Sequence, residues 1–315
     1  QPTSTESALR QTADAGSTAS DDTSEEEAVS AKGLKGVGSL LVTGGSITAD
    51  CADDALHTNG SMGVAGGTFT LQTGDDGMHA DGALVISGGT IDVQKCYEGL
   101  EGQSITISGG SITVTASDDG LNAAGGSDAS GQNGRQDAFA ADENAFITIS
   151  GGSITVSADG DGVDSNGDLT ISGGALYVNG PTSSGDGALD YNGTAAVTGG
   201  TVIAVGASGM AEGFGDTSTQ YSFLVNLPAS VAGGTALSIA DGSGKTLATY
   251  TPSKAYQSVC VSLPALKKGE TYTITAVAVN EGGGMGGHGG GRPDKMNGGG
   301  PGRQQPSPGS TAPAS

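Results

Sequence analysis

Residues 107–124 read ISGGSITVTASDDGLNAA, and residues 149–164 repeat the same pattern as ISGGSITVSADGDGVD. The Gly-Gly pair in both stretches recurs with its first glycine at positions 44, 66, 88, 109, 151, 173 and 199. The steps are 22, 22, 21, 42, 22 and 26 residues, so the doubled step contains an insertion and the last step is stretched. A nearly constant step predicts one structural unit that is added again and again.

Each repeat contains short segments in which apolar and polar residues alternate. Ile154 and Val156 fall on one face of such a segment, and Ser153 and Thr155 fall on the other. A second strand precedes each Gly-Gly pair, and a third follows an acidic turn. Three short strands joined by sharp turns predict one coil of an all-β, parallel β-helix. One coil cannot bury its own apolar face, so we expect the coils of residues 31–218 to stack, with the glycine pairs supplying positive φ at the turns.

The composition agrees with a solenoid and limits the partners. The chain has 59 glycines among 315 residues, 4% aromatic residues and no tryptophan, which is too few large side chains for an ordinary core. A formal net charge of -22 argues against nucleic acid and anionic membranes, and favours cations or neutral ligands. No stretch approaches the ~18–20 apolar residues of a membrane helix. The three cysteines are not expected to form a disulfide framework.

Four segments outside the regular repeats have their own patterns. Residues 1–30 are polar and predict a disordered stalk, or else a short helix over Glu25–Ala31 that caps the first coil. The insertion, 125–144, is a long loop of small polar residues. Longer strands within 219–280, with a hairpin turn at 241–244, predict a C-terminal β cap. The Gly/Pro-rich residues 281–315 predict a disordered tail.

The sequence begins at Gln1 rather than Met. We interpret this start as the product of a removed export signal or lipid-anchored leader. The expectation is an extracellular or cell-surface protein with a lipid or cell-wall tether at its N-terminus.

A short acidic phrase recurs between the strands, and we call it the corner phrase. Stacking of the coils places its first residues in one column, the acid column, and its fourth residues in a second column that should point outward. Asp53, Asp75 and Asp118 add charge directly before the first position. The phrase occurs as Lys32–Lys35, Asp54–His57, Asp76–His79, Glu98–Glu101, Asp119–Asn122, Asp161–Asp164 and, one residue longer, Asp186–Asp190.

Carboxylates stacked about 5 Å apart repel one another unless their pKa values rise or a cation lies between them. Ca²⁺ suits such columns because it accepts six to eight oxygen ligands in flexible geometry. His57 and His79 would also admit a transition metal, but two histidines are too few for a convincing zinc site. The alternative is a purely structural corner, because Asp and Gly are favoured in sharp turns. The expected metal ligands are Asp53, Asp54, Asp75, Asp76, Glu98, Glu101, Asp118, Asp119, Asp161, Asp164, Asp186 and Asp190.

Several non-identical phrases follow one another in a fixed order. They are Lys32-Gly33-Leu34-Lys35, Asp53-Asp54-Ala55-Leu56-His57, Asp75-Asp76-Gly77-Met78-His79-Ala80-Asp81, Tyr97-Glu98-Gly99-Leu100-Glu101 and Asp118-Asp119-Gly120-Leu121-Asn122-Ala123-Ala124, with Tyr250–Tyr256 and Leu266–Tyr272 further on. This succession, over about residues 31–280, resembles the family of clostridial cell-surface carbohydrate-binding β-helix proteins. The resemblance implies a right-handed parallel β-helix similar to that of pectate lyases, bound Ca²⁺, and binding of cellulose and acidic pectic polymers. Ala55 departs from the glycine of the phrase.

The expected function is non-catalytic, calcium-dependent binding of plant cell-wall or other acidic polysaccharide. The lack of tryptophan shifts the expectation from cellulose toward polyuronates such as polygalacturonate or pectin, whose carboxylates Ca²⁺ would bridge to the protein. Candidate ligand-binding residues are His57, His79, Tyr97, Asn122, Arg135 and Tyr191.

Two alternatives stay open. A polysaccharide lyase would need Ca²⁺ to acidify a sugar proton and a base to remove it, and Lys95 is the best candidate for that base. A structural or adhesive rod would use its acids only for solubility and edge protection.

Overall fold

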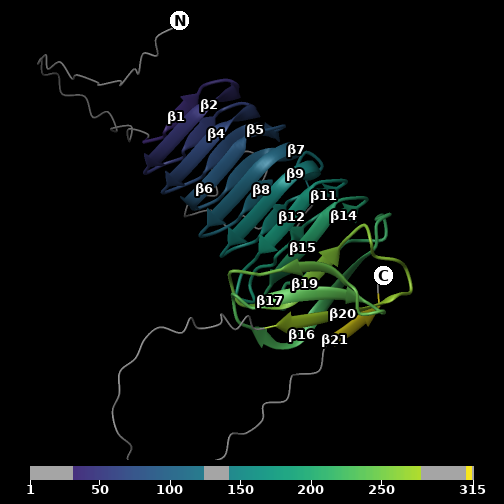
Figure 1. Ribbon diagram of the computed structural model, residues 1–315. Coiled ribbons are helices and arrows are strands. Elements are labelled where there is room, and N and C mark those ends of the chain that lie inside the picture. Colours follow the sequence, from purple (N-terminus) through teal and green to yellow (C-terminus); the bar gives the residue numbers. More distant parts are fainter. Residues whose placement is uncertain (1–30, 124–141, 278–309, 314–315) are drawn as a thin grey trace, which may run out of the picture. The chain divides into compact units, whose positions relative to one another are not determined.

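The computed structural model describes residues 31–123 and 142–277, and the backbone of 310–313 (Figure 1). The expected stalk or helix at 1–30, most of the insertion including Arg135, and most of the expected tail lie outside the described residues. Within the described part there is no helix, and so none that could cross a membrane.

The first fifteen strands stack as coils of a parallel β-solenoid, which confirms the predicted all-β fold (Figure 1). Some strands run through the Gly-Gly pair without a break, so two or three of the expected short strands merge into one. The strands are β1 (Leu34–Gly36), β2 (Leu40–Cys51), β3 (Leu56–Thr58), β4 (Met62–Thr73), β5 (Met78–Ile86), β6 (Thr90–Cys96), β7 (Leu100–Ala116), β8 (Leu121–Ala123), β9 (Phe146–Ala158), β10 (Val163–Ser165), β11 (Asp168–Ile171), β12 (Ala175–Asn179), β13 (Asp190–Tyr191), β14 (Ala195–Val197) and β15 (Thr201–Gly206).

The register between coils follows the sequence repeat. Leu34 pairs with Leu56 and Leu56 with Met78, each one repeat further along the chain. The pairing resumes across the doubled step, where Ile112 pairs with Ile154. The insertion therefore adds no coil, and residues far apart in sequence become neighbours on adjacent strands about 4.8 Å apart.

The two glycines of each pair serve different purposes. Where a preceding coil packs against it, the first has no room for a side chain, since a Cβ on Gly109 would lie 2.5 Å from the carbonyl oxygen of Ser87, and one on Gly151 would lie 2.3 Å from that of Ser108. The second has φ between 77° and 111°, a region that L-residues rarely adopt. These second glycines are Gly45, Gly67, Gly89, Gly110, Gly152, Gly174 and Gly200.

The inward residues of the strands form continuous apolar columns. One such column runs through Phe69, Ile91, Ile112 and Ile154, all at most 1% exposed. Each fully buried side chain of this size contributes roughly 1.5–3 kcal/mol. In the first described coil Leu40 is only partly buried, because β2 pairs with β4 alone. Stacking, rather than any single coil, therefore buries the core.

Beyond the coils, five strands lie between residues 219 and 280, where the sequence predicts longer strands. β19 pairs antiparallel with β15 and so occupies the edge of the last coil. The ring of Tyr250 stacks on Tyr177 at 5.1 Å between centroids, and Lys254 Nζ pairs with Asp159 Oδ1 at 2.6 Å. These strands are β16 (Ser222–Val231), β17 (Ala236–Asp241), β18 (Thr246–Tyr250), β19 (Tyr256–Ser262) and β20 (Thr271–Val277), and β20 also pairs with β21 (Ser310–Pro313).

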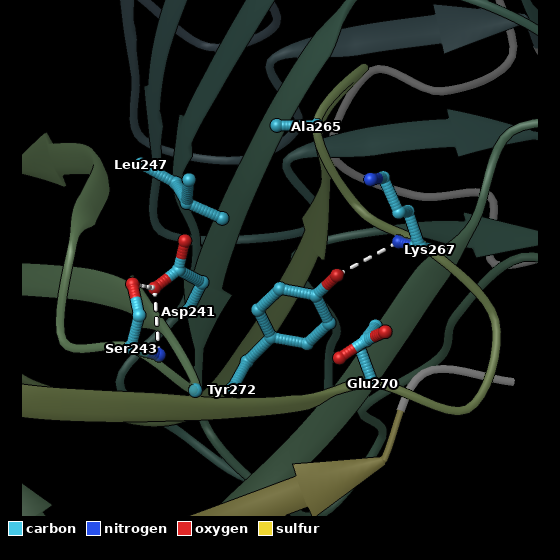
Figure 2. A pocket seen from close by; sticks show the side chains of 8 residues that line it. Asp241, Ser243, Leu247, Ala265, Lys267, Glu270 and Tyr272 are labelled. Atoms are coloured by element: carbon cyan, nitrogen blue, oxygen red, sulfur yellow. Dashed lines mark hydrogen bonds between the residues drawn. The ribbon is translucent and has the colours of Figure 1, made fainter.

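A cavity of about 270 Å³ lies beside β17 and β20 (Figure 2). Its walls are fixed by hydrogen bonds, because the backbone N–H of Lys267 donates to the Tyr272 hydroxyl at 2.8 Å and Ser243 Oγ donates to Asp241 at 2.6 Å. None of the corner-phrase residues lines it. The lining residues are Asp241, Gly242, Ser243, Leu247, Ala265, Lys267, Glu270 and Tyr272.

Candidate functional site

The corner phrases stack in register, as the sequence predicts. Parallel pairing joins the fourth residues of successive phrases into one column, which we call the fourth-residue column. Its members, each paired with the next, are Lys35, His57, His79, Glu101, Asn122, Asp164 and Asp190. Residues that are between 21 and 42 positions apart in sequence thus lie on adjacent strands.

The acid column has a structural role that the sequence pattern did not reveal. The carboxylate of one coil accepts a hydrogen bond from the backbone N–H of the acid in the next coil. Asp54 Oδ1 accepts from Asp76 N at 3.2 Å, Asp76 Oδ1 accepts from Glu98 N at 3.3 Å, and Asp119 Oδ1 accepts from Asp161 N at 2.6 Å. These bonds satisfy buried amides and explain why an acid recurs at this position.

In the last phrase the extra residue shifts the alignment. Gly187 N donates to Asp161 Oδ1, and Gly187 O accepts from Gly162 N, so Gly187 takes the place that an acid holds in earlier coils. Asp186 lies just outside the column.

The expectation that the fourth-residue column points to solvent was wrong for its central members. His57 is 2% exposed, His79 0% and Glu101 1%. The corner turns sharply enough that the first and fourth residues face each other, as shown by His57 Nδ1, which lies 2.7 Å from Asp54 Oδ2. Neighbouring coils then cover the pair from both sides. The polar columns are therefore largely buried, and their charges have to be compensated.

In the first coils the protein supplies its own cations. Lys32 Nζ lies 2.9 Å from Asp53 Oδ1 and also pairs with Asp54. Burial alone would lower the pKa of Lys32, but hydrogen bonds to Asp54 and Asp53 raise it above its ordinary value. The sequence pattern had given Lys32 no role, because its partners come from the next repeat.

His79 is the second internal cation. Its Nδ1 lies 3.0 Å from Asp76 Oδ2 and contacts Glu101, and its Nε2 lies 3.2 Å from Asp81 Oδ1. Burial alone would lower the pKa of His79, but the bonds to Asp76 and Glu101 raise it to about 11, so the ring is positively charged at neutral pH. The rings of His57 and His79 stack at 4.8 Å. Two groups of side chains here could geometrically hold a metal, Asp54/His57/His79 and Asp76/His79/Glu101, but they already bind one another.

The later coils differ sharply. Asp119, Asp161 and Asp164 each place one carboxylate oxygen within 4.8 Å of the others. Across the described ranges, no lysine, arginine or histidine forms an ion pair with any of them, and Lys254 pairs only with nearby Asp159. We call these three residues the acidic triad.

The surroundings of the acidic triad disfavour the charged form of its carboxyl groups. Burial, and then the charges of Asp161 and Asp190, raises the pKa of Asp164 to about 8. Burial is also the main cause that raises the pKa of Asp161 to about 7 and that of Asp119 well above its ordinary value. Without a cation the triad therefore carries less than its full negative charge at neutral pH, and a bound cation would favour the ionised form of its carboxyl groups.

A neutral oxygen lies in the same column. Asn122 is 4% exposed, and its side-chain nitrogen donates to Glu98 Oε2 at 2.7 Å. Its Oδ1 is buried and has no hydrogen-bond partner, which costs roughly 1–3 kcal/mol. Because Asn122 pairs with Asp164 in the parallel register, both side chains extend from the same face. The three carboxylates offer oxygen ligands only, as does the Asn122 amide on the strand beside Asp164, and oxygen ligands fit Ca²⁺ and not a thiophilic metal.

Other predicted site residues lie in varied places. Tyr97 is half-buried beside the acid column, whereas Tyr191 packs against the core and donates its hydroxyl to Gly213 O at 2.6 Å. Lys95 on β6 is exposed.

One acid was missed by the sequence reasoning. Glu212 follows Asp190 by one 22-residue step, and burial together with the charge of Asp190 raises its pKa. Its Oε2 is buried without a partner. The repeat length alone could have found it, but the residues around it no longer match the phrase.

Comparison with known proteins identifies the family of this chain. The chain matches, over residues 3–77 and 75–243, a family model described as carbohydrate-binding domain-containing protein. No curated protein and no solved structure matches it. Since the matched ranges together span residues 3–243 of 315, this chain belongs to the family of carbohydrate-binding domain-containing proteins.

Proposed function

We propose that this protein binds acidic polysaccharide, such as polygalacturonate or pectin, through Ca²⁺ held by the acidic triad and Asn122. The observation that carries the proposal is the contrast between the two ends of the acid column. Lys32 and His79 neutralise its first coils, whereas the triad has no such partner among the described residues.

Charge is the reason for placing a cation at the triad. An acidic protein with a net charge of -22 repels a polyuronate, whose sugars also carry carboxylates. Asp119, Asp161 and Asp164 would hold Ca²⁺, with Asn122 Oδ1 as a neutral ligand. Since the three acids are only partly buried, the ion would remain accessible to a carboxylate of the ligand. Bound Ca²⁺ supplies the positive charge that joins the two anions.

Family membership supports binding of carbohydrate. We also propose that the protein works outside the cell or at its surface, where such polymers occur.

The test is retention on immobilised polygalacturonate, with Ca²⁺ and with a chelator. We expect retention in Ca²⁺ that the chelator abolishes. Asp161→Asn and Asp164→Asn keep an acceptor oxygen but remove charge, and together should lower retention at least tenfold. The matched control is Asp50→Asn, an exposed acid outside the clusters, which should bind as the wild type does. Retention that is equal with and without chelator would refute the calcium bridge.

A further inference from the structure

Tyr97 interrupts a stack of acids. The backbone N–H of Tyr97 donates to Asp75 O at 2.7 Å, and Tyr97 O accepts from Asp118 N at 3.0 Å. Tyr97 therefore lies between Asp75 and Asp118 on successive coils, at the position directly before the acid column. The next coil along carries Asp119, a member of the acidic triad.

The use of tyrosine in this chain sets Tyr97 apart. The sequence has seven tyrosines, and the structure describes all of them. Six lie in a hydrophobic core or pack against one, and Tyr97 alone belongs to neither core. The six core tyrosines are Tyr177, Tyr191, Tyr221, Tyr250, Tyr256 and Tyr272.

The surroundings of Tyr97 hold its ring in place. Its hydroxyl interacts with the carboxylate of Asp118, which together with burial raises the pKa of Tyr97 above its ordinary value. The ring is half-buried, so one part is fixed and the rest faces solvent. Tyrosine with a held hydroxyl offers a rigid apolar surface at low cost in side-chain entropy.

We propose that Tyr97 is the platform of a sugar subsite, on which a pyranose ring packs its C–H face one coil away from the acidic triad. This inference rests on the proposed function and adds the position and direction of the polymer. The spacing of about 4.8 Å between coils is comparable to the length of one sugar unit in an extended chain. A polyuronate would therefore run along the stacking direction, with one sugar on Tyr97 and the carboxylate of a neighbouring sugar on the ion.

The experiment titrates an oligogalacturonate in saturating Ca²⁺ by calorimetry. Tyr97→Ala should weaken binding roughly tenfold or more, whereas Tyr97→Phe, which keeps the ring, should stay within a few-fold of the wild type. The matched control is Phe146→Ala, since Phe146 is 38% exposed and lies outside the corner. This control should bind normally. Because the chain lacks tryptophan, the ligand-induced change in tyrosine absorbance should also disappear in Tyr97→Phe.

A second readout separates the subsite from the ion site. The rise in melting temperature caused by Ca²⁺ alone should be the same in the wild type, Tyr97→Ala and Tyr97→Phe. Wild-type affinity in Tyr97→Ala would overturn the subsite and leave the calcium bridge intact. Loss of the Ca²⁺-induced rise in Tyr97→Ala would also overturn it, because the residue would then act through the ion. A wild type that binds no acidic oligosaccharide removes both proposals.

Discussion

At the residue scale, the same short phrase creates two different electrostatic situations. Asp76 and Asp161 occupy equivalent places, and each accepts a backbone N–H from the next coil. What differs is the neighbour, because His79 supplies a positive charge beside Asp76 while Asp164 adds a negative one beside Asp161. The identity of the fourth residue of the phrase thus decides whether a corner carries its own positive charge or places two carboxyl groups side by side.

This difference predicts how stability depends on pH in the presence of a chelator. Folding raises the pKa of Asp161 to about 7 and that of Asp164 to about 8, so between pH 4 and 8 the folded protein holds more protons than the unfolded chain. Stability should therefore fall as pH rises through this window. His79, with a pKa of about 11, continues the decrease above pH 7.

Thermal melting from pH 4 to 9 checks this expectation. Saturating Ca²⁺ should flatten the profile between pH 5 and 8, since the ion replaces the protons. Asp164→Asn should reduce the slope in chelator. A melting temperature that rises from pH 5 to 8 in chelator would show that folding does not raise the pKa values of the triad.

At the same scale, the sequence predicted which residues lie on adjacent strands but not how far their side chains are buried. The 22-residue step was enough to place His57 beside His79 and Asn122 beside Asp164. Strict alternation along a strand suggested that these side chains face solvent. It failed because the corner folds His57 back onto Asp54. The orphan oxygen of Asn122 and the pairing of Lys32 depend on side-chain rotamers, which spacing does not specify.

At the element scale, glycine fixes how closely two coils approach. A Cβ on Gly120 would lie 2.2 Å from Val156 Cγ1, so the glycine of the corner phrase leaves space for a β-branched neighbour. Where Ala55 replaces this glycine, Leu71 stands in the column of the facing valines, and leucine is unbranched at Cβ. The replacement of the phrase glycine by Ala55 is thus accompanied by a leucine, Leu71, at the position where the other coils have valine. Sequence alone could identify both positions, but not that they touch.

The Gly-Gly turn provides a direct test of stacking between coils. Gly109 and Gly44 hold the same place in their turns, but among the described residues only Gly109 has a preceding coil against it, with Ser87 O 2.5 Å from a built Cβ. Gly109→Ala should lower the free energy of unfolding by about 1–3 kcal/mol through overpacking. Gly44→Ala, with no atom within 4 Å of the built Cβ, should change it little. Urea denaturation of both variants compares them, and equal midpoints would contradict the stacked arrangement.

At the scale of the whole molecule, repetition turns distant residues into a linear array of sites. The solenoid, its register and the strands after residue 219 followed from period and alternation, because each coil obeys the same local rules. The proposed function depends instead on deviations from the repeat. Lys32 and His79 supply positive charge in the first coils, whereas among the described residues no cationic side chain forms an ion pair with Asp119, Asp161 or Asp164.

The central claim is that a cation belongs in that cluster, and crystals grown in Ca²⁺ test it most directly. An anomalous difference map collected at a long wavelength would locate every bound calcium ion. We expect a peak coordinated by Asp119, Asp161, Asp164 and Asn122 Oδ1, and no peak among Lys32, Asp54, His79 and Glu101, where the protein carries its own positive charges. A peak in the histidine cluster with none at the triad would contradict it.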